Sequence, residues 1–225
     1  MGTKSRSLSA GRRNKSQAPG VDTLRMHIAT DAARIMAEEG VRDFQIAKRK
    51  AAERLGLPET KHLPGNDEVD TALQEHLRLF HGGRHRQGVR RLRELAAEAM
   101  RFLEKFEPRL VGPVLSGTVT STSVIELHLT ADTTEEIGFW LDDHGIPYKQ
   151  ANRRLRFGGD RYETYPAYSF TADGVPVELC VFDHRQARET PLSPIDGKPM
   201  KRANRREVEM LIDGATAANA GTLVK

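Results

Sequence analysis

Apolar side chains in the first half of the chain recur at the 3.6-residue spacing of amphipathic helices. They predict four helices before residue 107, each with a stripe that needs a partner surface. Gly40 and Gly56 are expected to end the first two helices, and Asn66 is a suitable N-cap for the third. The glycine-rich segment 81–88 predicts a flexible break before the fourth. The stripes are Leu24, Ile28, Ala32, Ile35 and Met36; Phe44, Ala47, Ala51 and Leu55; Val69, Leu73, His76, Leu77 and Phe80; and Val89, Leu92, Ala96, Ala99, Leu103 and Phe106.

From residue 107 onward the pattern changes to the two-residue alternation of β-strands. In the segment 124–130 the apolar residues at odd positions are expected on one face, and Val124, Glu126 and His128 on the other. The other elements predicted here are a short strand at 109–111, a helix at 133–144, strand-like pieces at 146–149 and 153–157, a hairpin of 165–171 and 175–182 around Asp173-Gly174, and a last helix at 204–212.

These patterns predict an α+β fold, in which a helical N-terminal half is followed by a mixed sheet with flanking helices. The boundary between the halves is expected near 106–108. The predicted parts are a disordered basic tail (1–22), a helical region (23–106), an α/β domain (107–213) and a frayed tail (214–225).

Composition narrows the classes of protein that fit. The net charge of +4 and the pI of about 9.3 permit contact with nucleic acid, nucleotide phosphates or an acidic surface. Cys180 is the only cysteine, which rules out an intramolecular disulfide and suggests a cytoplasmic location. No apolar run approaches the roughly 18 residues of a membrane helix, so no membrane partner is expected. The P-loop motif of many ATPases is also absent.

Candidate chemistry gathers in the segment LVGPVLSGTVTSTSVIELHL, residues 110–129. It places Gly112-Pro113 at a predicted helix start, about ten residues before the strand that carries Glu126. Glu178 lies on the polar side of a later apolar strand, VPVELCVF. Carboxylates on one face of a sheet can share the metal ions that assist phosphoryl or nucleotidyl transfer. A helix start attracts the phosphates of a nucleotide.

This arrangement resembles the core of the DNA polymerase beta-like nucleotidyltransferases over residues 109–182. The resemblance implies Mg²⁺ or Mn²⁺ as cofactor, with Glu126 and Glu178 as catalytic and metal-binding carboxylates. It also implies a nucleotide-binding set that comprises Gly112, Ser116, Gly117, Thr118 and Ser123. The whole chain also resembles a group of bacterial proteins whose helical N-terminal half contains runs such as AKRKAAERLGLP, and this resemblance implies no function.

Two positions depart from the family pattern. Val124 stands where the family has its first acid, and Pro113 replaces the serine of the Gly-Ser pair. Loss of one carboxylate from a two-metal site is expected to lower the rate by about 10³-fold or more. The sequence therefore indicates a degenerate site, and it leaves open whether the protein is an enzyme.

Other interpretations of the same residues stay open. Glu126, His128 and Glu178 could bind a single Mn²⁺ or Zn²⁺ ion. Alternatively, both glutamates pair with arginines, and His128 is a hydrogen-bonded or partly exposed histidine. The Pro/Gly-rich segment 191–200 is either a lid or an ordered connector. The arginines proposed for the pairing are Arg153, Arg154 and Arg156.

Three functional hypotheses follow. In the first, the protein binds a nucleotide or nucleic acid such as RNA in a degenerate nucleotidyltransferase site, with basic segments around 48–50, 84–93, 153–156 and 198–206 lining a groove for phosphates. In the second, it is a working transferase with a rearranged acid set that adds Asp132 or Asp183. In the third, it is a scaffold or regulatory protein that binds a protein partner through its helical half.

Overall fold

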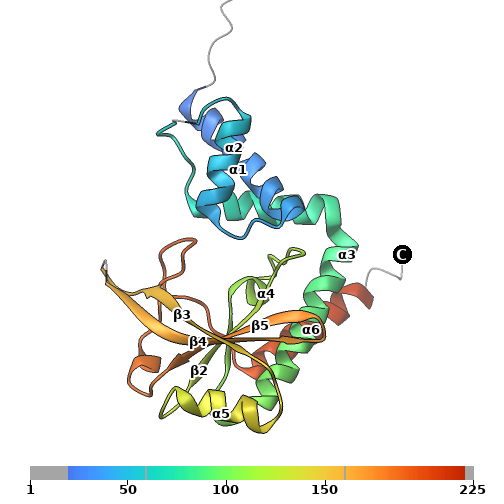
Figure 1. The fold of residues 1–225 in the computed structure, drawn as a ribbon. Helices are drawn as coiled ribbons and strands as arrows, with labels where there is room; N and C mark the ends of the chain where they lie inside the picture. Colours follow the sequence, from blue (N-terminus) through green and yellow to red (C-terminus); the bar gives the residue numbers. More distant parts are fainter. Residues whose placement is uncertain (1–19, 59, 160, 221–225) are drawn as a thin grey trace, which may run out of the picture.

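The computed structural model describes residues 20–58, 60–159 and 161–220 (Figure 1). Residues 1–19 of the predicted tail (1–22) and the last five residues therefore lie outside the described part. Residues 21 and 22 begin the first helix, so the predicted tail is wrong there. The fold is α+β, as the sequence predicts: a helical half precedes a five-stranded mixed sheet. None of the described helices combines the length and apolar character that crossing a membrane requires.

The helical half is built from α1 (Val21–Glu39), α2 (Phe44–Arg54) and the first part of α3 (Asn66–Phe102). Gly40 ends α1 in the left-handed conformation, with φ +70°, as expected for a helix C-terminus. Asp43 caps α2 by accepting a hydrogen bond from the backbone N–H of Ile46 at 2.9 Å. The first three predicted stripes contribute to one core, although Leu55 and Phe80 are exposed. The fourth stripe belongs to the core under the sheet. The core of the helical half includes Ile28, Ala32, Ile35, Ala47, Ala51, Val69, Leu73 and Leu77.

The predicted break at 81–88 is wrong, because α3 is one helix of 37 residues. A glycine inside a helix costs only about 1 kcal/mol, and tertiary contacts offset this cost. The ring of His85 hydrogen-bonds the carbonyl of Gly117 at 2.9 Å, and Arg93 donates to the carbonyls of Val114 and Leu115. The helix bends near its middle (Figure 1), where three glycines lie in the sequence. Its first part packs in the core of the helical half, and its second part packs in the core under the sheet.

The start of α3 also differs from the prediction. Gly65 occupies the N-cap position, and α3 begins at Asn66. The side chain of Asn66 instead accepts a hydrogen bond from the buried Nζ of Lys48 at 2.8 Å. Asn66 therefore ties α2 to α3.

The sheet has the strand order β1-β2-β5-β4-β3. Its strands are β1 (Arg109–Val111), β2 (Ile125–Thr130), β3 (Lys149–Arg156), β4 (Tyr162–Ala172) and β5 (Val175–Phe182). Only β2 and β5 pair in parallel, and the other described pairs are antiparallel. The predicted hairpin forms, with φ values of +48° at Asp173 and +75° at Gly174, as a two-residue turn of this kind requires.

Some boundaries differ from the prediction. The two strand-like pieces at 146–149 and 153–157 are one strand, β3, which pairs with β4 along its whole length. It is an exposed edge strand without a buried alternation, so the sequence pattern is weak there. The last helix, α6 (Arg205–Ala220), is longer than predicted and includes 214–220 of the expected frayed tail. The remaining elements are η1 (Glu104–Phe106), α4 (Gly112–Ser116), α5 (Glu135–Asp143) and η2 (Gln186–Arg188).

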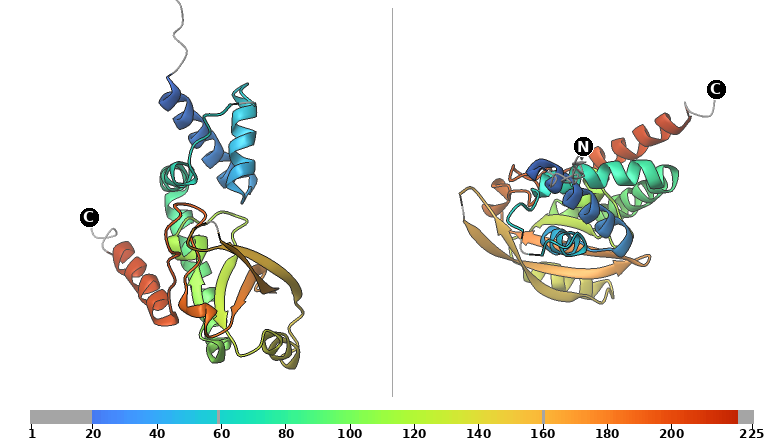
Figure 2. Two further views of the ribbon diagram at one scale, coloured as in Figure 1. Left: turned by 90° about the vertical axis from the view of Figure 1, so that its left-hand side faces the viewer. Right: turned by 90° about the horizontal axis from the view of Figure 1, so that it is seen from above.

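The two faces of the sheet are different. One face is covered by α5 and by α3 and α6 (Figures 1 and 2), and its side chains are apolar and buried. The helical half lies toward the opposite side, with few contacts to the strands (Figure 1). On that opposite side lie Glu126, His128 and Glu178, together with a small apolar cluster. The core between this face and the helices includes Ile125, Leu127, Leu129, Tyr168, Val177, Leu179 and Val181 from the strands and Ile137 and Leu141 from α5.

Candidate functional site

Glu126 and Glu178 are direct register partners on the parallel strands β2 and β5. We call these two residues the carboxylate pair. Because partners in a sheet point to the same face, both side chains project toward the helical half. They are 20% and 23% exposed, which is little for two glutamates. The sequence prediction that these two acids come together is confirmed.

Each member of the pair faces an arginine. Arg153 on β3 places its Nε 2.5 Å from a carboxylate oxygen of Glu178. Arg42, in the loop between α1 and α2, reaches across from the helical half and lies 3.4 Å from Glu126. A second contact supports this crossing, because the hydroxyl of Thr122 donates to the carbonyl of Gly40 at 3.0 Å.

The pairing of the glutamates with arginines is therefore confirmed, with Arg153 as the predicted partner. Arg154 instead stacks on the ring of Tyr162 at 4.3 Å, and its register places it on the other face of β3. Arg42 was not predicted. It lies 84 residues before Glu126 in the chain, and no local pattern connects the two.

Burial raises the pKa of Glu126 above its ordinary value. The charge of Arg153 opposes this, the neighbouring Glu178 adds to it, and Arg42 again opposes it. Since the effect of burial exceeds that of the arginines, the protein environment disfavours the ionised form of Glu126. A side chain that costs stability in this way is a candidate for a functional role.

The helix start at Gly112 packs directly against Glu126. Gly112 has φ +70°, and a Cβ there would lie 2.9 Å from Oε2 of Glu126. Glycine is therefore required for two reasons, the left-handed backbone and the close approach of the carboxylate. The predicted order of strand, glycine and helix start is confirmed, with Pro113 in the first turn of α4.

The rest of the predicted nucleotide-binding set is held by local contacts. The hydroxyls of Ser116 and Thr118 hydrogen-bond each other at 2.7 Å. The hydroxyl of Ser123 accepts a hydrogen bond from the N–H of Thr120 at 2.9 Å. The carbonyl of Gly117 is bound by His85. Of the glycines in the predicted set, Gly112 lies close to the carboxylate of Glu126, and Gly117 lies near the guanidinium of Arg93.

The residues present do not fit the two-metal site of the nucleotidyltransferases. Val124 is buried and offers no ligand at the first acid position. Both remaining carboxylates face guanidinium groups, which compete with a metal ion for the same oxygens. In the described part of the chain, no three His, Cys, Asp or Glu side chains are placed to hold a metal ion.

The acids of the rearranged set lie at the other end of the strands. Asp132 follows the C-terminal end of β2, is 81% exposed and pairs with His184 at 3.2 Å. Asp183 follows β5 and accepts hydrogen bonds from the N–H groups of Arg185 and Gln186. Six residues of extended chain span about 20 Å. Neither aspartate therefore joins Glu126 as a third carboxylate.

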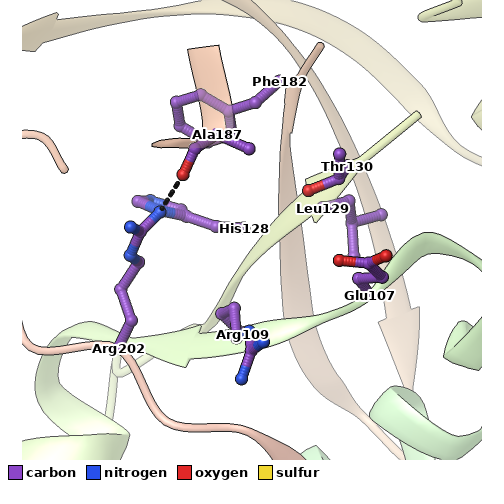
Figure 3. A pocket seen from close by; sticks show the side chains of 8 residues that line it. All are labelled: Glu107, Arg109, His128, Leu129, Thr130, Phe182, Ala187 and Arg202. Carbon is purple, nitrogen blue, oxygen red and sulfur yellow. Dashed lines mark hydrogen bonds between the residues drawn. The ribbon is translucent and has the colours of Figure 1, made fainter. Parts of the chain in front are cut away.

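His128 lies two residues after Glu126 on β2, so both side chains are on the same face. It is 6% exposed, its ring packs 4.8 Å from the ring of Phe182, and its Nδ1 is buried without a hydrogen-bond partner among the described residues. Burial, together with the charges of Arg202 and Arg153, lowers the pKa of His128 to about 3, so the ring is neutral at physiological pH. It lines a cavity of about 270 Å³ with Arg109 and Arg202 (Figure 3).

The segment 191–200 is an ordered connector that joins the two halves. The carbonyl of Pro194 accepts a hydrogen bond from Nδ2 of Asn66 at 2.6 Å. The N–H of Leu192 donates to the carbonyl of Arg156 at 2.7 Å. This supports the connector interpretation over the lid.

The comparisons with known proteins give no family for this chain: no protein-family model, curated protein or solved structure matches it.

Proposed function

We propose that this protein binds the phosphates of a nucleotide, or of a nucleic acid such as RNA, at the carboxylate pair, in a degenerate nucleotidyltransferase site. The observation that carries the proposal is the pair itself with its two arginines. Two glutamates on adjacent core strands, one with a raised pKa, are costly to a fold that does not use them.

The order of elements supports the family part of the proposal. A short strand leads through Gly112 into a helix, the next strand carries Glu126, and a parallel neighbour carries Glu178. This is the order that the sequence resemblance implies. Gly112 against the Glu126 carboxylate adds a steric reason for the glycine of that pattern.

The arginines support binding without metal-assisted transfer. Arg42 and Arg153 are 47% and 44% exposed, and each lies within ion-pair distance of one member of the carboxylate pair. A guanidinium has five N–H donors, so both retain donors for phosphate oxygens. The two guanidinium groups are the cations that this site offers to phosphate oxygens.

The proposal is tested by titrating the full chain with ATP, GTP, CTP and UTP, with and without Mg²⁺. Arg153→Gln is expected to weaken binding about tenfold, which is the loss of one charge-assisted hydrogen bond. Arg154→Gln is a matched control, because this residue is the neighbour of Arg153 on the opposite face of the same strand. Equal losses in both variants, or nucleotidyl transfer by the wild-type protein, would contradict the proposal.

A scaffold function through the helical half is the second candidate. Leu79 and Phe80 on α3 are 65% and 67% exposed, and Met26 on α1 is 59% exposed. Exposed large apolar side chains are common at protein interfaces. Pull-down with the Leu79→Ser, Phe80→Ser double variant tests this function. Retention of every partner that the wild-type chain captures would exclude these two residues as the interface.

A further inference from the structure

A second polar site lies next to the carboxylate pair, at the cavity of about 270 Å³ between β1, β2, β5 and the segment before α6. Its lining combines two arginines, a buried histidine and a glutamate with apolar walls (Figure 3). The volume is below the roughly 300 Å³ at which sites for drug-sized ligands begin. The cavity therefore suits a small group rather than a whole nucleotide. The lining residues are Glu107, Arg109, His128, Leu129, Thr130, Phe182, Ala187 and Arg202.

The guanidinium of Arg202 is fixed at the cavity by neutral groups. It donates to the carbonyl of Ala187 at 3.2 Å and to the hydroxyl of Thr190 at 2.6 Å. These two contacts hold the side chain in place beside the ring of His128 (Figure 3). Neither contact neutralises its charge, and burial lowers the pKa of Arg202.

Arg109 adds a second positive charge. Its strand position on β1 is the register partner of His128 on β2, and its charge further lowers the pKa of Arg202. In the described part of the chain, neither arginine has a carboxylate within salt-bridge distance. Glu107 also lines the cavity, but Figure 3 shows its carboxylate beside Leu129 and Thr130, away from Arg202.

His128 supplies the third observation. Its side chain is more than nine-tenths buried and lines the cavity, and the absence of a partner for Nδ1 within the described residues is costly. A ligand with a negative charge would offset the repulsion between the two arginines. Its oxygen atoms would also give His128 a hydrogen-bond partner.

We propose that this cavity binds a small oxyanion of the phosphate class, held by Arg202 and Arg109, with His128 as a further polar contact. The ligand is inorganic phosphate or the phosphate group of a monoester. The site uses residues other than the carboxylate pair and its arginines. It goes beyond the proposed nucleotide binding and does not depend on it.

The test is calorimetric titration of the full chain with inorganic phosphate at low ionic strength, and with glycerol 3-phosphate as the monoester. Arg109→Gln is the main variant, because this side chain is exposed and takes part in none of the described side-chain hydrogen bonds or ion pairs. It is expected to weaken phosphate binding about tenfold. Arg78→Gln removes an equal charge from an exposed position in the helical half and is expected to leave binding unchanged.

A second variant tests the site without changing its charge, because the ring of His128 is neutral. His128→Phe retains a ring beside Phe182 and removes both ring nitrogens, and it is also expected to weaken binding several-fold. The tighter of the two titrants identifies the free ion or the monoester as the ligand class. Absence of saturable binding of both titrants, or equal weakening by Arg109→Gln and Arg78→Gln, would overturn the proposal. Nucleotide binding that is weakened in Arg153→Gln but unchanged in Arg109→Gln separates the two sites.

Discussion

The two faces of β2 differ in composition: one carries buried apolar side chains, and the other carries Glu126 and His128. Leu127 is completely buried against the helices that cover one face. Its neighbours Glu126 and His128 point to the other face. There, burial disfavours the ionised form of Glu126, and Nδ1 of His128 lacks a hydrogen-bond partner in the described structure. One face follows the rules of a hydrophobic core, while the other departs from them. Such departures are expected where a protein binds something.

The largest effect is expected on the covered face. Leu127→Ala should lower the free energy of unfolding by about 3 kcal/mol, because it removes a fully buried side chain and leaves a cavity. Urea denaturation followed by circular dichroism measures this loss. Nucleotide affinity of the folded variant should remain that of the wild type. A loss below about 1 kcal/mol would mean that this face is not the main core.

The next effect concerns the contact between Gly112 and Glu126. Gly112→Ala should destabilise the protein by about 2 kcal/mol, through the left-handed backbone and the clash with the carboxylate. Gly56→Ala is a matched control, because Gly56 has φ +74° and open space around its Cβ position.

The difference between these two variants should shrink when Glu126 is also replaced by alanine, since the clash is then removed. A double-mutant cycle measured by urea denaturation checks this. Equal destabilisation by Gly112→Ala and Gly56→Ala would contradict the close approach of Glu126.

Replacing Glu126 should have the opposite effect on stability. Because burial raises the pKa of Glu126 in the folded protein, folding is disfavoured once this carboxyl ionises. The penalty is absent below the ordinary glutamate pKa and fully present above the raised pKa. Glu126→Gln should therefore have a higher melting temperature than the wild type at pH 8, and the difference should vanish near pH 4.

A lower melting temperature of Glu126→Gln at pH 8 would show the opposite balance. The ion pair with Arg42 and the charge of Arg153 would then outweigh the cost of burial, and Glu126 would be a structural residue.

The smallest effect is expected in the reactivity of the Cys180 thiol. Burial raises the pKa of the Cys180 thiol to about 12, so the thiolate is scarce at neutral pH. Iodoacetamide should leave Cys180 unmodified in the native protein and alkylate it in urea, as mass spectrometry would detect. Rapid native modification would mean that this face opens to solvent.

Sequence reasoning succeeded where local pattern decides the structure. The alternation in 124–130 placed Glu126 and His128 opposite the apolar residues, and the Asp173-Gly174 pair marked the hairpin. It failed at 81–88, where contacts of α3 with the segment after β1 outweigh the low helix propensity of glycine. Local propensity carries no information on such contacts.

The candidate site shows the same division. The order of glycine and acids along the chain was sufficient to bring Glu126 and Glu178 together. The arginines of the two proposed sites were harder to place, because Arg42 comes from the helical half and Arg202 from the basic segment before α6. These residues meet the sheet only through the tertiary fold, and a charge in a polar segment looks the same whether it is solvated or part of a site.

The most direct test of the central claim compares nucleotide binding by the wild-type chain and by Glu126→Gln, each with and without Mg²⁺ or Mn²⁺, by calorimetry. If arginines hold the phosphates, binding needs no metal and Glu126→Gln keeps or tightens it, because a negative charge beside the ligand is removed. Binding that requires metal and disappears in Glu126→Gln would contradict this account and indicate a working metal site. Absence of binding to all four nucleotides would also contradict it.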